Sequence, residues 1–156
     1  MLLRALAVAL PVFLLDRLSK YWVVEVIDLR NRLFVPVLDP WLNFTMAWNE
    51  GINFGLMDMG GNGRWVLIGL ALAIVLGLAI WIRKQDSWLV AAGAGAIMGG
   101  ALGNVWDRIQ YGAVADFLNM SCCGIQNPFA FNIADAAIFG GAIFIALFVR
   151  SDDAPR

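Results

Sequence analysis

Four long apolar segments constrain this chain more than any other feature of its sequence. They cover residues 2–24, 65–82, 88–105 and 133–149. An α-helix needs about 20 mostly apolar residues to cross the roughly 30 Å hydrocarbon core of a bilayer, and each segment is close to that length. The chain is 61% hydrophobic and 15% charged, whereas soluble domains average about 45–50% and about 25%. We therefore expect an all-α membrane protein in which residues 1–156 form a single domain with four transmembrane helices.

The two long connections between these helices, residues 25–63 and 106–132, are expected to lie outside the membrane. The first is too polar and too interrupted to cross a bilayer. Within it, residues 34–38 and 41–46 have the composition of short strands, and Asp39-Pro40 between them favours a turn. This pattern predicts a small extramembrane β-rich subdomain between the first and second helices.

The distribution of basic residues predicts how the helices are oriented. Four spans put both ends of the chain on one side, and an excess of lysine and arginine in short segments marks the cytoplasmic side. We therefore expect both termini in the cytoplasm and the β-rich subdomain at the outer face of the membrane. The ends and the short turn hold Arg4, Arg83, Lys84, Arg150 and Arg156, whereas the long loop holds Arg30, Arg32 and Arg64.

Several kinds of chemistry are excluded by composition. The chain contains no histidine, which excludes Ser-His-Asp catalysis, Cys-His catalysis and zinc sites built on histidine. A net charge of −1 without a basic cluster gives no indication of nucleic-acid binding. The adjacent Cys122 and Cys123 make neither a disulfide framework nor a four-ligand metal site. We expect both to be small, partly buried residues, with a redox or lid role left open.

Two aspartates lie in apolar surroundings near the ends of predicted helices. Asp116 follows Ala113-Val114-Ala115, and Asp135 lies between Ile133-Ala134 and Ala136-Ala137-Ile138. Burying two carboxylates close together favours a shared proton. The ionised aspartate can then deprotonate a water that attacks a peptide carbonyl, and the protonated one can donate to the developing oxyanion. The pattern predicts a membrane-embedded aspartyl peptidase that requires no cofactor and no metal.

Polar residues close to these aspartates are candidates to support them. Asn104 and Asp107 share a helix face if the third helix continues, Arg108 adds a positive charge, and Asn132 is about one turn before Asp135. Amide and guanidinium groups can hold carboxylates in place. Two other readings stay open: the asparagines cap helices or bond between helices, and Asp107-Arg108 is a local ion pair.

The first helix carries its own charged pair, and two later helices carry small-residue stripes. Asp16 and Lys20 are four residues apart on one helix face. They form either an interfacial ion pair, with Lys20 extending to the surface, or a support beneath the active site. Glycine or alanine every fourth residue predicts close helix packing. These stripes are Gly69, Ala73 and Gly77 in the second helix and Gly95, Gly99 and Gly103 in the third.

Five short motifs, taken together, resemble the bacterial lipoprotein signal peptidase family, also called signal peptidase II. The resemblance covers nearly the whole chain in order, and the combination of motifs, spacing and four spans is highly specific. The motifs are Asp16-Arg17-Leu18-Ser19-Lys20, Asn49-Glu50-Gly51-Ile52-Asn53-Phe54-Gly55, Gly99-Gly100-Ala101-Leu102-Gly103-Asn104-Val105-Trp106-Asp107-Arg108, Gly112-Ala113-Val114-Ala115-Asp116-Phe117 and Phe131-Asn132-Ile133-Ala134-Asp135-Ala136.

The resemblance implies a four-helix inner-membrane aspartyl peptidase, expected to be a monomer in contact with membrane lipid. Its substrates would be prolipoproteins with a diacylglyceryl group on a cysteine, cleaved just before that cysteine, with Asp116 and Asp135 as the catalytic dyad. The chain departs from the family at Asn53, where alanine is frequent, and at Ala136, where serine is frequent. The motif positions expected to line or support the site are Asn49, Gly51, Asn104, Arg108, Asn132, Asp16 and Lys20.

Two non-enzymatic readings compete with the peptidase. Intramembrane carboxylates also relay protons, which makes a proton-coupled transporter or channel component the main alternative. A transporter is expected to hold its carboxylates near the membrane midplane, whereas Asp116 and Asp135 lie at segment ends. A structural assembly factor would explain the glycine stripes but not the two aspartates in apolar runs.

Overall fold

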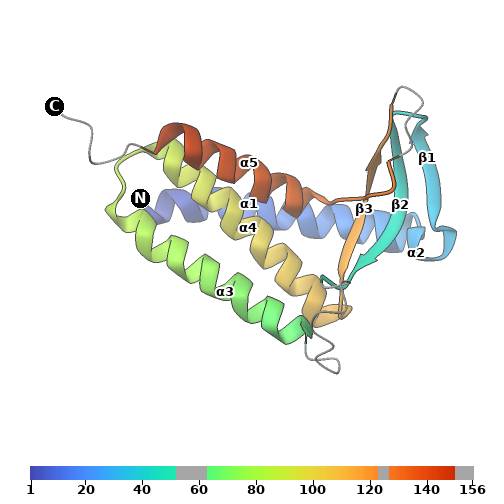
Figure 1. Cartoon of the computed structure of the whole chain (residues 1–156), viewed down its shortest axis with the longest axis horizontal. Coiled ribbons are helices and arrows are strands. Elements are labelled where there is room, and N and C mark those ends of the chain that lie inside the picture. Colours follow the sequence, from blue (N-terminus) through green and yellow to red (C-terminus); the bar gives the residue numbers. More distant parts are fainter. Residues whose placement is uncertain (52–62, 123–126, 150–156) are drawn as a thin grey trace.

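A computed structural model describes residues 1–51, 63–122 and 127–149 of the chain. Long helices run side by side through most of the molecule, and a three-stranded sheet stands across one end of them (Figure 1). In chain order the elements are α1 (Leu2–Lys20), the π-helix η1 (Tyr21–Val26), α2 (Leu29–Arg32), β1 (Phe34–Leu38), β2 (Leu42–Asn49), α3 (Gly63–Trp81), the 3-10 helix η2 (Ile82–Lys84), α4 (Trp88–Gln110), β3 (Val114–Met120) and α5 (Ile133–Phe148).

The four predicted helices are all present, with some shifted ends. The first continues as a π-helix to Val26, and α4 ends at Gln110 rather than at residue 105. Within the described residues, Gly63–Lys84 and Trp88–Gln110 are long and apolar enough to cross a membrane, and Ile133–Phe148 is a shorter apolar helix. Length and composition thus identify two candidate spans, not four.

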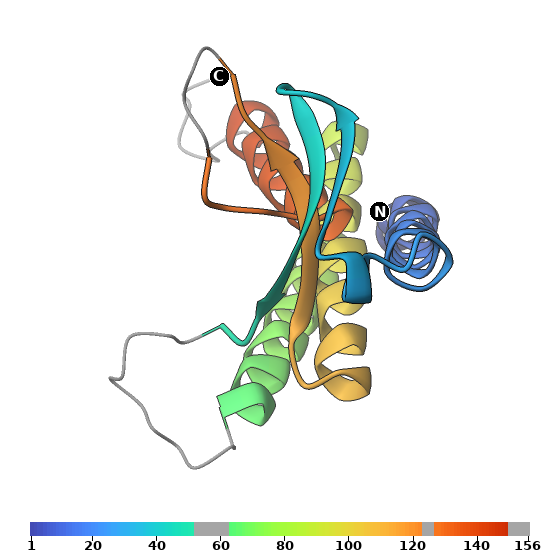
Figure 2. The same cartoon turned by 90° about the vertical axis from the view of Figure 1, so that its right-hand side faces the viewer.

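Helix α4 lies at the centre of the bundle and contacts α1, α3 and α5 (Figure 2). The predicted stripe in α4 packs closely against α1, because a Cβ added at Gly95, Gly99 or Gly103 would collide with Ala5, Ala9 or Asp16 respectively. Another face of α4 approaches α5 equally closely through Gly93 and Gly100. Missing side chains therefore let three helix backbones approach one another.

The predicted stripe in α3 does not pack against another helix. A Cβ added at Gly69 or Gly77 meets no other atom within 4 Å in the part of the chain that the structure describes. The prediction of close packing was therefore wrong for this helix. Four-residue spacing alone does not show which face of a helix meets a neighbour.

The sheet has the order β1-β2-β3 and both pairs are antiparallel. The first two strands match the prediction closely, but β3 comes from the connection between α4 and α5, which was predicted as an extramembrane loop. The expectation that the β-rich part lies wholly between the first two long helices was therefore wrong. Residues 114–117 and Asn119 are buried, so this strand lacks the apolar–polar alternation that identifies a half-exposed strand.

Apolar side chains join the sheet to the helical part. Phe117 of β3 and Phe44 of β2 meet edge to face, with ring centroids 5.9 Å apart, and they pack with Val23 and Leu29. This small core lies where α1 ends and the sheet begins. It holds β3 across the ends of α4 and α5, which brings Asp116 toward the beginning of α5.

Candidate active site

Asp116 is held in a buried position on β3. Its side chain accepts hydrogen bonds from Asn132 Nδ2 at 2.6 Å and from Asn49 Nδ2 at 3.0 Å, and the residue is only 4% exposed. Burial and, after it, the nearby charge of Asp135 raise the pKa of Asp116, while the two amide donors and Lys20 lower it, and the net result is a pKa of about 6. Asp116 therefore takes up a proton at a much higher pH than an ordinary aspartate.

Asp135 is held at the beginning of α5. Its backbone N–H donates to Asn132 Oδ1 at 2.9 Å, and its carboxylate accepts from the Asn132 N–H at 3.3 Å. These two bonds form a capping box, which satisfies two donors that a helix start would otherwise leave unpaired. Asn104 Nδ2 of α4 donates to the other carboxylate oxygen at 2.9 Å. The carboxylate is thus fixed from both α5 and α4.

Asn132 connects the two aspartates. Its side chain donates to Asp116, and its backbone N–H donates to Asp135. The residue is fully buried. The sequence left open whether Asn132 caps a helix or bonds between segments, and it does both. The structure therefore brings the two predicted aspartates to either side of one residue.

The end of β2 that carries Asn49 is fixed from two sides. Asn49 pairs with Val114 in the antiparallel ladder, which puts its side chain diagonally across from Asp116. The preceding residue, Trp48, packs against Tyr111 with ring centroids 5.4 Å apart and ring planes tilted by 57°, and Arg30 lies over both rings. Asn49 itself is exposed, so it reaches Asp116 from the open side of the site.

A cluster of four charged side chains, Asp16, Arg17, Lys20 and Asp107, lies next to Asn104; Arg17 is half-buried and the other three are buried. Lys20 Nζ lies 3.0 Å from Asp16 and 2.6 Å from Asp107, and Arg17 Nη2 lies 2.9 Å and 2.5 Å from the same two carboxylates. Lys20 is 2% exposed, so the reading in which it extends to the surface was wrong. Lys20 also donates to Asn104 Oδ1 at 3.1 Å, which links the cluster to Asp135.

Arg17 was missing from the predicted site residues, and Asp107 was a candidate support that was not among the motif positions expected to line or support the site. The carboxylate of Asp107 pairs with the two cations of α1, so the reading of Asp107-Arg108 as a local ion pair was wrong. The sequence did contain a signal. Arg17 belongs to the same motif as Asp16 and Lys20, and Asp107 is three residues after Asn104 on α4.

Arg108 and Gly51 lie close together at the site. A Cβ added at Gly51 would collide with Leu67 and would lie 3.6 Å from a guanidinium nitrogen of Arg108. Gly51 also has a φ of 90°, which side chains disfavour. The positive charge of Arg108 acts on Asp135, Asp107 and Asp116. Its Nε is buried and has no hydrogen-bond partner within the described residues.

The sequence also singled out Asn53, Cys122, Cys123 and Ala136. Asn53 and Cys123 lie outside the described residues. Cys122 is exposed, not partly buried as expected. Ala136 is exposed on the first turn of α5.

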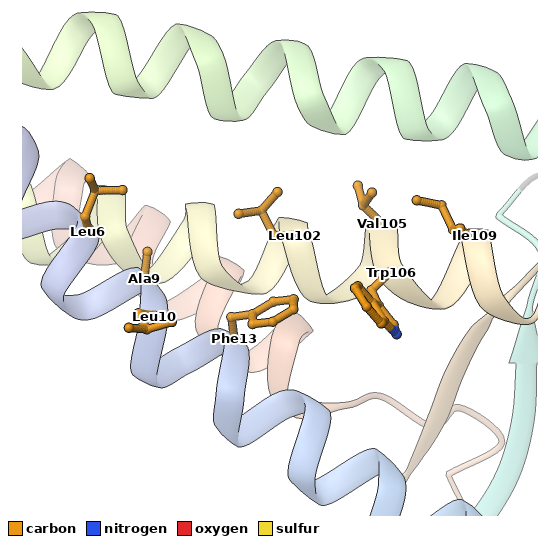
Figure 3. Close-up of a pocket in the computed structure, with 8 residues that line it drawn as sticks. All are labelled: Leu6, Ala9, Leu10, Phe13, Leu102, Val105, Trp106 and Ile109. Atoms are coloured by element: carbon orange, nitrogen blue, oxygen red, sulfur yellow. The ribbon is translucent and has the colours of Figure 1, made fainter.

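An apolar groove of about 450 Å³ lies between α1 and α4 (Figure 3). Its walls include Leu6 and Leu10 of α1, and Leu102 and Ile109 of α4. Phe13 and Trp106 meet edge to face across it at 6.3 Å. Because none of the lining residues is charged, this groove can hold hydrocarbon but offers a peptide few hydrogen-bonding groups.

Comparisons with known proteins identify the family to which the chain is similar. Residues 8–150 match the family described as signal peptidase (SPase) II. Proteins named lipoprotein signal peptidase are 40% identical in Caulobacter vibrioides, over 92% of this chain and 84% of that protein, and 43% identical in Shewanella amazonensis, over 90% and 83%. In Methylorubrum extorquens the identity is 43%, over 85% of this chain and 77% of that protein.

A solved structure described as a bacterial membrane enzyme, obtained by the in meso method at 2.3 Å resolution, has a similar fold. It superposes with a TM-score of 0.75 and 25% identity, and the match covers 92% of this chain and 85% of that one. The fold, the matched length and the identity to relatives all support membership of the same family. The chain belongs to the signal peptidase II family and is a peptidase of the aspartic type.

Proposed function

We propose that Asp116 and Asp135 are the catalytic dyad of this peptidase, and that it removes the signal peptide from diacylglyceryl-modified prolipoproteins by cleaving just before the lipidated cysteine. The observation that carries the proposal is the position of Asn132, which bonds to Asp116 at 2.6 Å and to Asp135 at 3.3 Å. Two carboxylates so arranged can divide the roles of acid and base.

In the proposed reaction, the ionised aspartate accepts a proton from a water as the water oxygen bonds to the scissile carbonyl carbon. The protonated aspartate donates to the carbonyl oxygen, which forms a neutral tetrahedral intermediate. The C–N bond then breaks. The aspartate that took a proton from the water gives it to the amine of the lipidated cysteine, and the other aspartate takes back the proton that it gave to the carbonyl oxygen. The raised pKa of Asp116, about 6, favours this residue as the holder of the proton once substrate covers the site and excludes water.

Contacts to the substrate peptide are proposed for Asn49, Gly51 and Arg108. Asn49 is exposed while it bonds to Asp116. The buried Nε of Arg108 has no partner in the described residues and is a donor that a peptide carbonyl can use. Gly51 leaves the guanidinium uncovered. Asn104, Asn132, Asp16 and Lys20 are proposed to hold the dyad rather than the substrate.

We further propose that all four long helices cross the bacterial inner membrane, with both termini in the cytoplasm and the dyad at the outer face. The start of α1, the turn with Arg83 and Lys84, and the end of α5 lie at the end of the bundle away from the sheet (Figure 1). Exposed Trp41 and Trp48 in the sheet region suit the opposite interface. The protein is proposed to act as a monomer, with lipid chains in the groove between α1 and α4.

This arrangement suits a lipid-modified substrate. The acyl chains can remain in the bilayer while the peptide on the outer side reaches Asp116 and Asp135. The transporter alternative gains no support from the relatives, which are named as peptidases. Asp116 also lies on a strand rather than inside a long helix, which does not favour a proton path through the helical part.

The test is cleavage of a purified diacylglyceryl-prolipoprotein in detergent by the wild type, Asp116→Asn and Asp135→Asn. Asp86→Asn is the matched control, because it removes an exposed carboxylate far from the dyad in sequence and in the fold. We expect cleavage by the wild type and the control and none by either dyad variant, with all four proteins folded by circular dichroism. Normal cleavage by either dyad variant would contradict the assignment.

A further inference from the structure

We propose that Asp16 and Asp107 are positioning residues that hold the backbone just before each dyad aspartate and, through Arg17 and Lys20, fix the two segments relative to each other. This inference rests on the proposed function, since it explains how the dyad is aligned. It adds Asp107 and Arg17 to the site and gives the first-helix motif a defined mechanical role.

Each carboxylate binds one backbone N–H next to the dyad. Asp107 accepts from the N–H of Ala115 at 3.2 Å, and Ala115 immediately precedes Asp116. Asp16 accepts from the N–H of Ala134 at 3.1 Å, and Ala134 immediately precedes Asp135. Both alanines are fully buried, so neither N–H has water as an alternative partner. The two contacts are equivalent although they come from different helices.

The two carboxylates are joined by shared cations. Arg17 and Lys20 each contact both Asp16 and Asp107, at distances from 2.5 to 3.0 Å. A displacement of one carboxylate therefore displaces the cations that hold the other. The segment that leads into Asp116 and the segment that leads into Asp135 are connected through four side chains, in addition to their common contact with Asn132.

Gly103 allows a perturbation of this cluster that removes no charge. A Cβ added at Gly103 would collide with the carboxylate of Asp16, whereas a Cβ added at Gly95 would collide with the backbone of Ala5, two turns earlier along α4. Gly103→Ala therefore pushes the cluster directly. Gly95→Ala disturbs the same helix pair, α1 and α4, away from the cluster and serves as the matched control.

The kinetic test compares kcat and KM for cleavage of the prolipoprotein by these two variants. A misalignment of about 1 Å can lower a rate about 100-fold, so we expect Gly103→Ala to lower kcat at least about tenfold with KM within about twofold of wild type. Gly95→Ala is expected to keep kcat within about twofold. Equal losses in both variants would show that helix packing alone is affected and would overturn the proposal.

Hydrogen exchange at the amides of Ala115 and Ala134 tests the coupling without relying on activity. Of the two amides, Asp107 contacts only the Ala115 N–H, yet Asp107→Ala is expected to speed exchange at both, by about tenfold at Ala115 and by a smaller factor at Ala134. Faster exchange at Ala115 alone would disprove the coupling. If Asp107→Ala does not fold, Gly103→Ala supplies the same measurement from the Asp16 side.

The two readouts separate this inference from the proposed function. If the wild type does not cleave the prolipoprotein, the proposed substrate is wrong, but the exchange result still decides whether the two segments are coupled. If the wild type cleaves, while Asp107→Ala leaves the exchange at Ala134 unchanged and Gly103→Ala leaves the exchange at Ala115 unchanged, the proposed substrate stands and the coupling is refuted.

Discussion

Replacing Asn132 with serine separates two tasks that one side chain performs at the dyad. Asn132 Oδ1 caps α5 by accepting from the Asp135 N–H at 2.9 Å, and Asn132 Nδ2 donates to Asp116 at 2.6 Å. Serine is about as good a helix cap as asparagine. Its shorter side chain, once engaged as a cap, does not reach Asp116. Asn132→Ser therefore keeps the cap and loses the contact with Asp116, whereas Asn132→Ala loses both.

The expected magnitudes follow from these contacts. A hydrogen bond to a charged group contributes about 1.5–3 kcal/mol, and a tenfold change in proton affinity corresponds to about 1.4 kcal/mol. Because Asn132 stabilises the ionised form of Asp116, its loss raises the pKa of Asp116 above the wild-type value of about 6. The missing cap should destabilise Asn132→Ala by about 1 kcal/mol relative to Asn132→Ser.

The assay is the pH dependence of kcat/KM for the wild type and both variants, together with thermal unfolding in detergent. We expect the alkaline limb of the profile, at which Asp116 loses its proton, to move to higher pH in both variants, and the melting temperature to fall further in Asn132→Ala than in Asn132→Ser. A serine variant with the wild-type rate and pH profile would refute the reasoning, because the contact with Asp116 would then have no role in aligning or tuning the dyad.

Three further predictions follow from other contacts. The folded-state pKa of Asp116, about 6, lies above the usual 3.8, so the folded protein favours the protonated carboxyl. The stability that this preference contributes is present below about pH 4 and is lost as the pH rises through 6. Asp116→Asn should therefore melt at a higher temperature than the wild type at neutral pH and not at about pH 4, and equal differences at both pH values would contradict this. Gly51→Ala should abolish most cleavage, because Gly51 has a φ of 90° and an added Cβ would collide with Leu67. Its exposed neighbour supplies the control variant, Glu50→Ala. Full activity of Gly51→Ala would show that the loop shape is unimportant. Gly69→Ala, which meets no atom within 4 Å in the described structure, should leave activity and melting temperature unchanged or slightly raised, and a marked loss would reveal a contact at that face.

Much of the functional site was predictable because the relevant signals are local. A buried aspartate in an apolar run is costly wherever the chain folds, so Asp116 and Asp135 were identifiable from their neighbours alone. Asn132 was identifiable because a helix cap and the third residue after it always lie together. Helix positions followed from apolar segments of nearly bilayer length, and their boundaries shifted by only a few residues.

The sequence by itself thus determined the helices, the first two strands and the two aspartates that we propose as the catalytic dyad. Only the tertiary structure decided that residues 114–120 pair with β2, because a strand buried on both faces has no alternation to detect. It also decided that Lys20 is buried, that Asp107 pairs with Arg17 of a helix 90 residues earlier, and that the α4 stripe packs while the α3 stripe does not. These contacts join segments far apart in the chain, and local pattern carries no information about which distant segment a side chain will meet.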